Sequence, residues 1–231
     1  MKKALLSLIL LAGAAGAANA QGLKLGLKGG FNGSTFSGSD SKGTQYKAGF
    51  AAGGLINYAF SDMISVQPEF LYSQKGASQD GAPYTVNGIT KTDGTRKTTL
   101  GYLDVPILLK VSAGEEGKGL FFEAGPQGSF VISQRAFTEN GSGSQEGASV
   151  TSTDGLNKVV LGYVAGLGYQ ITSGLGVGLR YTGDFTQLYK DETTTVTTLP
   201  DGSTISSSFK NPNLHNSVFQ FQVHYLFSFA K

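Results

Sequence analysis

The strongest constraint on this chain is the alternation of apolar and polar residues over eight long segments. A period of two residues puts alternate side chains on opposite faces of a β-strand. Each segment is longer than the roughly 5–6 residues of an ordinary strand and reaches the roughly 9–11 residues that cross a bilayer at a tilt. The chain is therefore predicted to be all-β. The segments span 22–32, 46–60, 62–74, 97–111, 119–133, 158–172, 174–186 and 216–230.

The two faces of these segments differ in polarity. In the last one, NSVFQFQVHYLFSFAK, alternate residues from Phe219 to Phe229 are aromatic or Val, and the residues between them are mostly polar. A soluble β-sandwich would have to bury charged faces in its core, whereas a barrel lumen pairs charges across strands. We therefore expect the apolar faces to contact lipid and the ionisable residues opposite them to form a structural ion-pair network in the lumen. These residues are Lys24, Lys28, Lys47, Glu69, Asp104, Lys110, Glu123, Arg180, Asp184 and His224.

The connections between the segments alternate in length. Short turns are expected at Ser61, at 112–118 and at Ser173. Outer-membrane barrels place their short turns in the periplasm and their long loops outside the cell. The pattern predicts an eight-stranded antiparallel up-and-down transmembrane β-barrel, with N- and C-termini periplasmic, in the outer membrane of a Gram-negative bacterium. The four long connections are 33–45, 75–96, 134–157 and 187–215.

The N-terminus has the features of a secretory signal peptide. Lys2 and Lys3 precede an apolar run, and Ala18-Asn19-Ala20 forms a small-x-small cleavage site. This divides the chain into a signal peptide, 1–20, and a barrel domain, 21–231. After residue 20 the sequence contains no run of about 18 apolar residues, so no transmembrane helix is expected. Without Lys2 and Lys3, the 18 basic residues become 16 and balance the 16 acidic ones, so no nucleic-acid partner is expected.

Three prolines interrupt the β-pattern. Pro68, Pro106 and Pro126 lie inside three successive segments, and proline cannot donate a hydrogen bond to a β-ladder. A closed barrel has no edge strand to receive them, so we predict bulges or local gaps in pairing at these positions. Such irregularities set curvature and tilt, and a weak lateral seam is the alternative interpretation.

Two stretches are more specific than the general pattern. ISVQPEFLYSQKG (64–76) and YLDVPILLK (102–110), together with the eight segments and the signal peptide, resemble the PorT-like outer-membrane β-barrel family of Bacteroidetes-type bacteria. The resemblance covers about Leu23 to Phe229 and does not extend to the loops. It implies a barrel without a known activity, and the family name implies a link to type IX secretion. The aromatic last segment also resembles the signal read by the barrel-assembly machinery.

Catalytic and metal-binding sites are alternative interpretations of some ionisable residues. His215, with Asp184 or Asp191 and a loop serine, would suit a hydrolytic site at the outer rim. Inward-facing Glu69, Asp104 and Glu123 could bind a cation, but nearby Lys and Arg favour ion pairs, and we expect Arg180 to pair with at least one of these acids. No G-x-S-x-G, H-E-x-x-H or P-loop occurs. We therefore predict no catalytic, cofactor-binding or metal residues.

The expected function is that of a non-enzymatic integral outer-membrane barrel with a structural, surface-interaction or secretion-accessory role. Its partners would be outer-membrane lipid, the assembly machinery during biogenesis, and unidentified envelope or secretion proteins. Turn signals at Asn87-Gly88 and Pro200-Asp201-Gly202 predict hairpins in two long loops. An outer-membrane hydrolase or acyltransferase with a site at the extracellular rim, and a soluble periplasmic ligand-binding barrel, are the alternatives.

Overall fold

A computed structural model describes most of the chain after the predicted signal peptide, which itself lies outside the described residues. No helix in this part of the chain is long and apolar enough to cross a membrane. The described residues are 22–81, 83–86, 89–92, 94–114, 118–139, 145–150, 152–172, 174–198 and 203–227.

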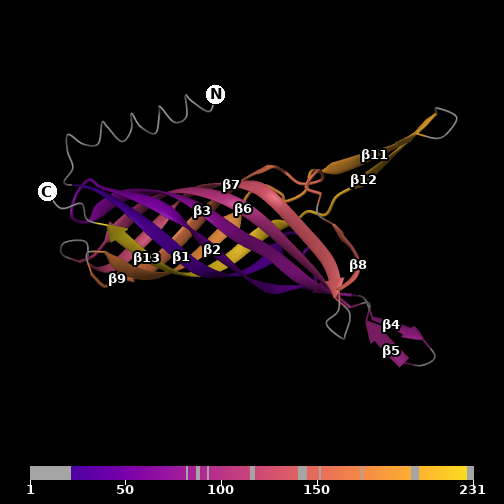
Figure 1. Ribbon diagram of the computed structural model, residues 1–231, viewed down its shortest axis with the longest axis horizontal. Coiled ribbons are helices and arrows are strands. Elements are labelled where there is room, and N and C mark those ends of the chain that lie inside the picture. Colours follow the sequence, from indigo (N-terminus) through magenta and orange to yellow (C-terminus); the bar gives the residue numbers. More distant parts are fainter. Residues whose placement is uncertain are drawn as a thin grey trace.

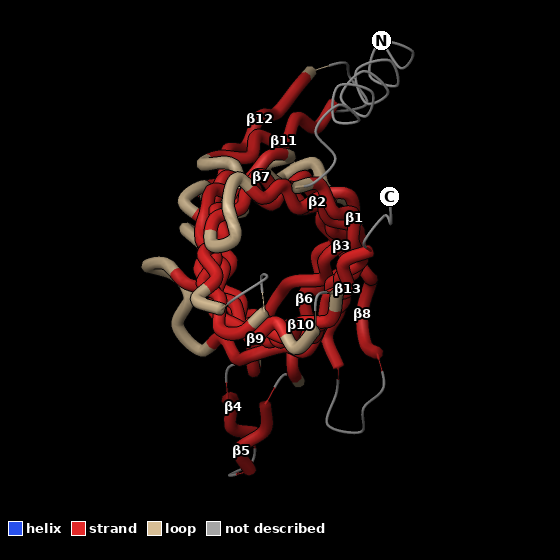
Figure 2. The backbone as a smooth tube through the Cα atoms, turned by 90° about the vertical axis from the view of Figure 1, so that its left-hand side faces the viewer, coloured by secondary structure: helices blue, strands red, loops and turns tan. Residues whose placement is uncertain are grey.

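Eight long strands form a closed antiparallel ring, as predicted (Figure 1). Each strand pairs with its neighbours in sequence order, and the ring closes where the first barrel strand pairs with the last. Figure 2 shows the ring in cross-section. The barrel strands are β1 (Leu23–Ser37), β2 (Thr44–Ala59), β3 (Ile64–Asp80), β6 (Thr95–Ser112), β7 (Gly119–Glu139), β9 (Val159–Gln170), β10 (Leu175–Asp184) and β13 (His215–Phe227).

The long connections lie at one end of the barrel, and three of them carry strands of their own (Figure 1). β4 (Pro83–Val86) pairs with β5 (Ile89–Thr92), and β11 (Glu192–Thr198) pairs with β12 (Thr204–Lys210). These are the two hairpins that the turn signals predict. β8 (Gln145–Val150) adds to the outer end of β7.

Several strands run further than the sequence pattern predicts. β1, β3 and β7 continue five or six residues past the expected ends at 32, 74 and 133. The expected ends mark where the apolar face stops, whereas backbone pairing continues through the polar residues above the membrane. At the periplasmic end the turns are tight, since the amides of Phe60 and Ser61 both donate to the carbonyl of Ile64.

The three prolines lie in gaps of the barrel ladder. Each proline interrupts pairing with the preceding strand, and pairing resumes in the same register, so these are local gaps rather than bulges. The prediction of bulges or local gaps at the prolines is therefore confirmed, in the form of local gaps. The gaps lie between the pairs Leu55–Glu69 and Tyr58–Val66, between Pro68–Ile107 and Leu71–Asp104, and between Pro106–Gln127 and Leu109–Ala124.

The barrel strands turn their apolar faces outward. Phe31 on β1 is 75% exposed, and Leu179 on β10 is 57% exposed. Arg180, the next residue along β10, is only 3% exposed because its side chain lies in the lumen. Large exposed apolar side chains around a polar interior are the arrangement that a lipid-facing barrel requires.

Candidate functional site

A cluster of four ionised side chains crosses the middle of the lumen. Arg180 donates from Nε and Nη2 to Glu123 Oε1 at 2.9 and 2.6 Å, and from Nη1 to Glu69 Oε2 at 2.9 Å. Lys28 Nζ lies 2.5 Å from Glu69 Oε1. These residues come from β10, β7, β3 and β1, so one cluster of two cations and two acids connects opposite walls of the barrel.

Neutral side chains donate further hydrogen bonds to Glu69 and Glu123. Gln67 Nε2 donates to Glu69 Oε1 at 2.7 Å, and Gln222 Nε2 donates to Glu123 Oε1 at 2.8 Å. Gly166 leaves space beside Glu123, because a Cβ at this position would lie 3.2 Å from Glu123 Oε1. Buried carboxylates are stable only when charges and hydrogen bonds satisfy them together, and both acids meet this condition.

A second ion pair joins β3 and β6. Lys75 Nζ lies 2.9 Å from Asp104 Oδ1, and Ser129 Oγ donates to the same oxygen at 2.6 Å. The Lys75 ammonium also lies 4.6 Å from the centre of the Tyr102 ring. Sequence reasoning missed Lys75 because it set the end of this segment at residue 74. The polar alternation of β3, continued beyond that point, would have found it.

Other residues expected in the network form no ion pair among the described residues, which corrects that expectation for them. Lys110 faces Glu123 across the β6–β7 ladder, but Glu123 is engaged with Arg180, and Lys110 donates instead to Gln170 Oε1 at 3.2 Å. His224 contacts the same Gln170 oxygen through Nε2 at 2.9 Å.

The remaining three expected members lie toward the two ends of the lumen, away from the central acids. Asp184 Oδ2 accepts a hydrogen bond from Asn216 Nδ2 at 2.7 Å. Lys47 reaches only the carbonyl of Ala48, at 3.5 Å, and Lys24 lines the periplasmic mouth. Within the described chain, the network is therefore smaller than expected and includes Lys75.

An apolar cluster occupies the outer end of the lumen. Leu156, Leu188 and Leu214 come from the long connections and are at most 8% exposed. The amide of Leu188 donates to the carbonyl of Leu214 at 2.7 Å. Neighbouring Tyr189 packs against this cluster, and burial raises the pKa of its phenol above the ordinary value. The cluster, named here the outer cap, comprises Phe36, Ala77, Leu100, Tyr102, Val131, Leu156, Val160, Leu188 and Leu214.

The candidate catalytic and metal residues do not come together in the described structure. His215 Nδ1 lies 3.2 Å from the carbonyl of Thr186, and Nε2 lies 3.0 Å from Asn213 Oδ1. Both ring nitrogens therefore contact neutral oxygens rather than Asp184 or Asp191. Glu69 and Glu123 share Arg180 while Asp104 binds Lys75. In the described residues no group of three His, Cys, Asp or Glu is placed to hold a metal ion.

A closed ring of eight long strands, apolar outside and charged inside, defines an integral outer-membrane β-barrel protein. The chain belongs to the family described as outer membrane protein beta-barrel domain, which matches residues 18–190. The protein therefore lies in the outer membrane of a Gram-negative bacterium, where its apolar surface contacts lipid.

Several solved outer-membrane proteins are similar to this chain. The Neisserial surface protein A (NspA) is 14% identical, with 90% of this chain and 100% of that chain covered and a TM-score of 0.48. Ail from Yersinia pestis is 13% identical, with 89% and 99% covered and a TM-score of 0.45. OprG from Pseudomonas aeruginosa is 12% identical, with 90% and 97% covered and a TM-score of 0.41. Among curated proteins, none matches the chain.

Proposed function

We propose that this chain is a non-enzymatic outer-membrane barrel that presents extracellular strands to partners at the cell surface. The observation that carries the proposal is the outer cap. Leucines from two long connections, β7–β9 and β10–β13, help to close the outer end of the lumen with buried apolar side chains. A capped lumen favours a role outside the barrel over the passage of solutes through it.

The extracellular hairpins offer a surface for such a role. β11 and β12 pair only with each other among the described strands, so each has an unpaired outer edge. Ile205 and Phe209 on β12 are 54% and 63% exposed, although they lie outside the lipid-facing band. Unpaired strand edges and exposed apolar side chains are the features by which extended partners are bound.

A replacement of the β11–β12 hairpin tests this role. Residues 192–210 would be exchanged for a short Gly-Ser linker, and the matched control would exchange 83–92, which contains β4 and β5. Heat-modifiable migration on gels checks that both variants form the barrel. We expect cells carrying the 192–210 variant to lose adhesion to surfaces or to one another. Adhesion unchanged from the native protein in both variants would refute the proposal.

A secretion-accessory role, which the PorT-like resemblance implies, is the second candidate. The two stretches that carry the resemblance form neighbouring strands, β3 and β6, and a proline gap interrupts the pairing between them. This interrupted, lipid-facing seam is a place where a membrane partner would contact the barrel. Deleting the gene and measuring the amount of secreted proteins at the cell surface tests this role. Unchanged surface export would exclude it.

A further inference from the structure

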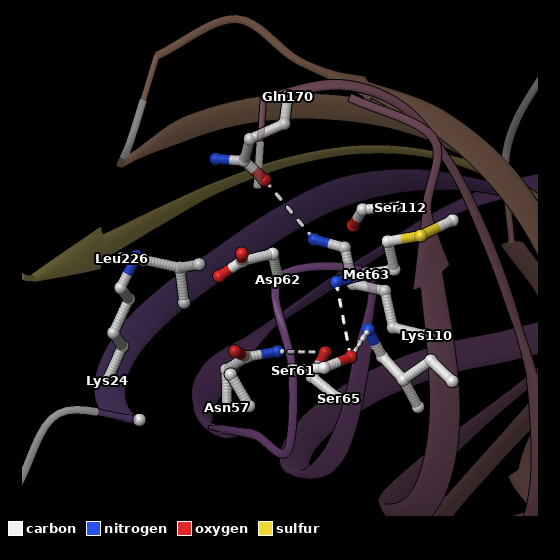
Figure 3. A pocket seen from close by; sticks show the side chains of 13 residues that line it. Lys24, Asn57, Ser61, Asp62, Met63, Ser65, Lys110, Ser112, Gln170 and Leu226 are labelled. Carbon is white, nitrogen blue, oxygen red and sulfur yellow. Dashed lines mark hydrogen bonds between the residues drawn. The ribbon is translucent and has the colours of Figure 1, made fainter. Parts of the chain in front are cut away.

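The periplasmic mouth of the lumen contains a polar cavity of about 290 Å³. Its walls are the periplasmic ends of several barrel strands and the turn between β2 and β3 (Figure 3). Two lysines line it, Lys24 from β1 and Lys110 from β6. Unlike the lumen centre, where cations and acids match in number, this end has two basic side chains, and the buried acid opposite Lys110 on the β6–β7 ladder, Glu123, is bonded to Arg180.

Lys110 is the better placed of the two lysines. It is 4% exposed, and among the described residues its ammonium donates to the Gln170 amide oxygen at 3.2 Å and lies 4.0 Å from the centroid of the Phe121 ring. An ammonium has three N–H donors, and a buried charge requires a counter-charge or several hydrogen bonds. The Gln170 oxygen is shared with His224. The direct contacts of Lys110 among the described residues are therefore neutral, and the one acid opposite it on the ladder, Glu123, is bonded to Arg180.

Hydroxyl groups, which can donate to an anion, also line the cavity. They belong to Ser61, Ser65 and Ser112, whereas the Asn57 amide nitrogen already donates to Ser65 Oγ at 2.9 Å and to Gln67 Oε1 at 3.2 Å. Figure 3 shows the Lys110 ammonium and the Ser112 hydroxyl on the Gln170 side of the cavity, and Asn57 bonded to Ser65. A tetrahedral oxyanion offers several acceptor oxygens to such a set of donors.

From this arrangement we propose that the periplasmic mouth binds a phosphate group through Lys110 and Lys24. The phosphate belongs either to a free ion or to the headgroup of an inner-leaflet phospholipid. Met63 and Ile64, which also line the cavity, are exposed apolar residues at its rim, and they would lie beside the acyl chains of a bound lipid. Asp62, the acid among the described lining residues, is exposed on the turn and opposes anion binding.

Titration of the refolded mature barrel with inorganic phosphate, followed by calorimetry in detergent, tests the site. Lys110→Met removes the charge and keeps an unbranched side chain, so phosphate should bind roughly tenfold more weakly or worse. Lys42→Met is the control, since Lys42 is an exposed lysine in the β1–β2 connection at the opposite end. Equal phosphate affinity of Lys110→Met and the native barrel would overturn the proposed role of Lys110.

Asp62→Asn gives a second test that does not alter a buried residue. Removing this carboxylate should tighten phosphate binding, because the cavity becomes more positive. Weaker or unchanged binding by this folded variant would contradict the proposal.

A second experiment, with lipids, distinguishes a free phosphate ion from a phospholipid headgroup. The barrel would be released from micelles containing phosphatidylglycerol or phosphatidylcholine and examined by native mass spectrometry. Retention of phosphatidylglycerol that Lys110→Met loses, with little retention of phosphatidylcholine, identifies an anionic lipid headgroup. Binding of inorganic phosphate alone identifies a free ion. If the native barrel binds neither inorganic phosphate nor phosphatidylglycerol, the site does not exist.

Discussion

The middle of the lumen and its outer end are both buried, yet different interactions hold them together. In the middle, Arg180 joins Glu69 and Glu123 across the barrel. At the outer end, Leu188 and its neighbours pack as an apolar cluster. Where lipid surrounds the barrel, apolar side chains face outward and the interior is polar. Where water surrounds the strands above the membrane, apolar side chains turn inward, as they do in a soluble protein.

The two regions should respond differently to mutation. A buried ion pair needs both partners, because loss of one leaves an uncompensated charge. Apolar packing loses stability in proportion to the volume that a mutation removes. We therefore expect abrupt losses in the middle and graded losses at the cap.

Arg180→Met should have the largest effect. It leaves Glu69 paired with Lys28 and leaves Glu123 without a cation at ion-pair distance among the described residues, and loss of a buried partner typically costs about 3–5 kcal/mol. Urea unfolding in lipid vesicles would measure the change, and Glu69→Gln in the same background should recover part of it. A double-mutant cycle that is additive within about 0.5 kcal/mol would show that the two residues are not coupled.

Leu188→Ala tests the cap. Truncation of a fully buried leucine costs about 2–5 kcal/mol where the site cannot collapse, and Leu188 is 0% exposed. Because the cap joins the loops to the barrel, we expect faster protease cleavage of the outer loops on intact cells. Leu188→Met, which keeps most of the volume, is the matched control. Identical cleavage rates for Leu188→Ala and the native protein would show that the cap does not hold the loops.

Leu179→Arg compares the outside of the barrel with the inside at neighbouring residues of one strand. Leu179 faces outward while Arg180 faces the lumen, and we expect Leu179 to lie near the middle of the bilayer. An Arg there should cost about 2–4 kcal/mol, and assembly into the outer membrane, scored by heat-modifiable migration, should fall. Leu179→Ala is the control. Equal assembly of the two variants would count against a lipid-facing position.

The membrane-spanning part of the fold can be predicted from the sequence, because the requirement for an apolar outer face and a polar inner face applies to each strand separately. Alternation alone separates Leu179 from Arg180 and places Glu69 and Glu123 on the inner faces of their strands. The partners within the network depend on strands far apart in the ring. Lys110 lies opposite Glu123, but Arg180 from β10 engages that acid, so Lys110 bonds to Gln170 instead.

The outer cap could not be predicted in the same way. Leu156, Leu188 and Leu214 are separated leucines in polar connections, and no period marks them as buried. Their burial depends on how two long connections fold over the barrel, and the backbone bond between Leu188 and Leu214 joins the two ends of one of them. Lys75 is a different case. The polar alternation of β3 includes it, but the predicted segment was ended at residue 74, where the apolar face stops.

Phe209→Ser, combined with Ile205→Ser, should have the smallest effect on stability. Both side chains are exposed on β12, outside the lumen centre and the outer cap, and exposed substitutions usually change stability by less than about 0.5 kcal/mol. Urea unfolding should therefore match that of the native barrel. If the hairpin contacts a partner through these side chains, adhesion should fall while stability does not. Ser206→Ala in the same strand is the control, because it changes an exposed residue without removing apolar surface. A loss of stability comparable to that of Leu188→Ala would place the hairpin in the packed part of the molecule and would contradict its assignment as a free binding surface.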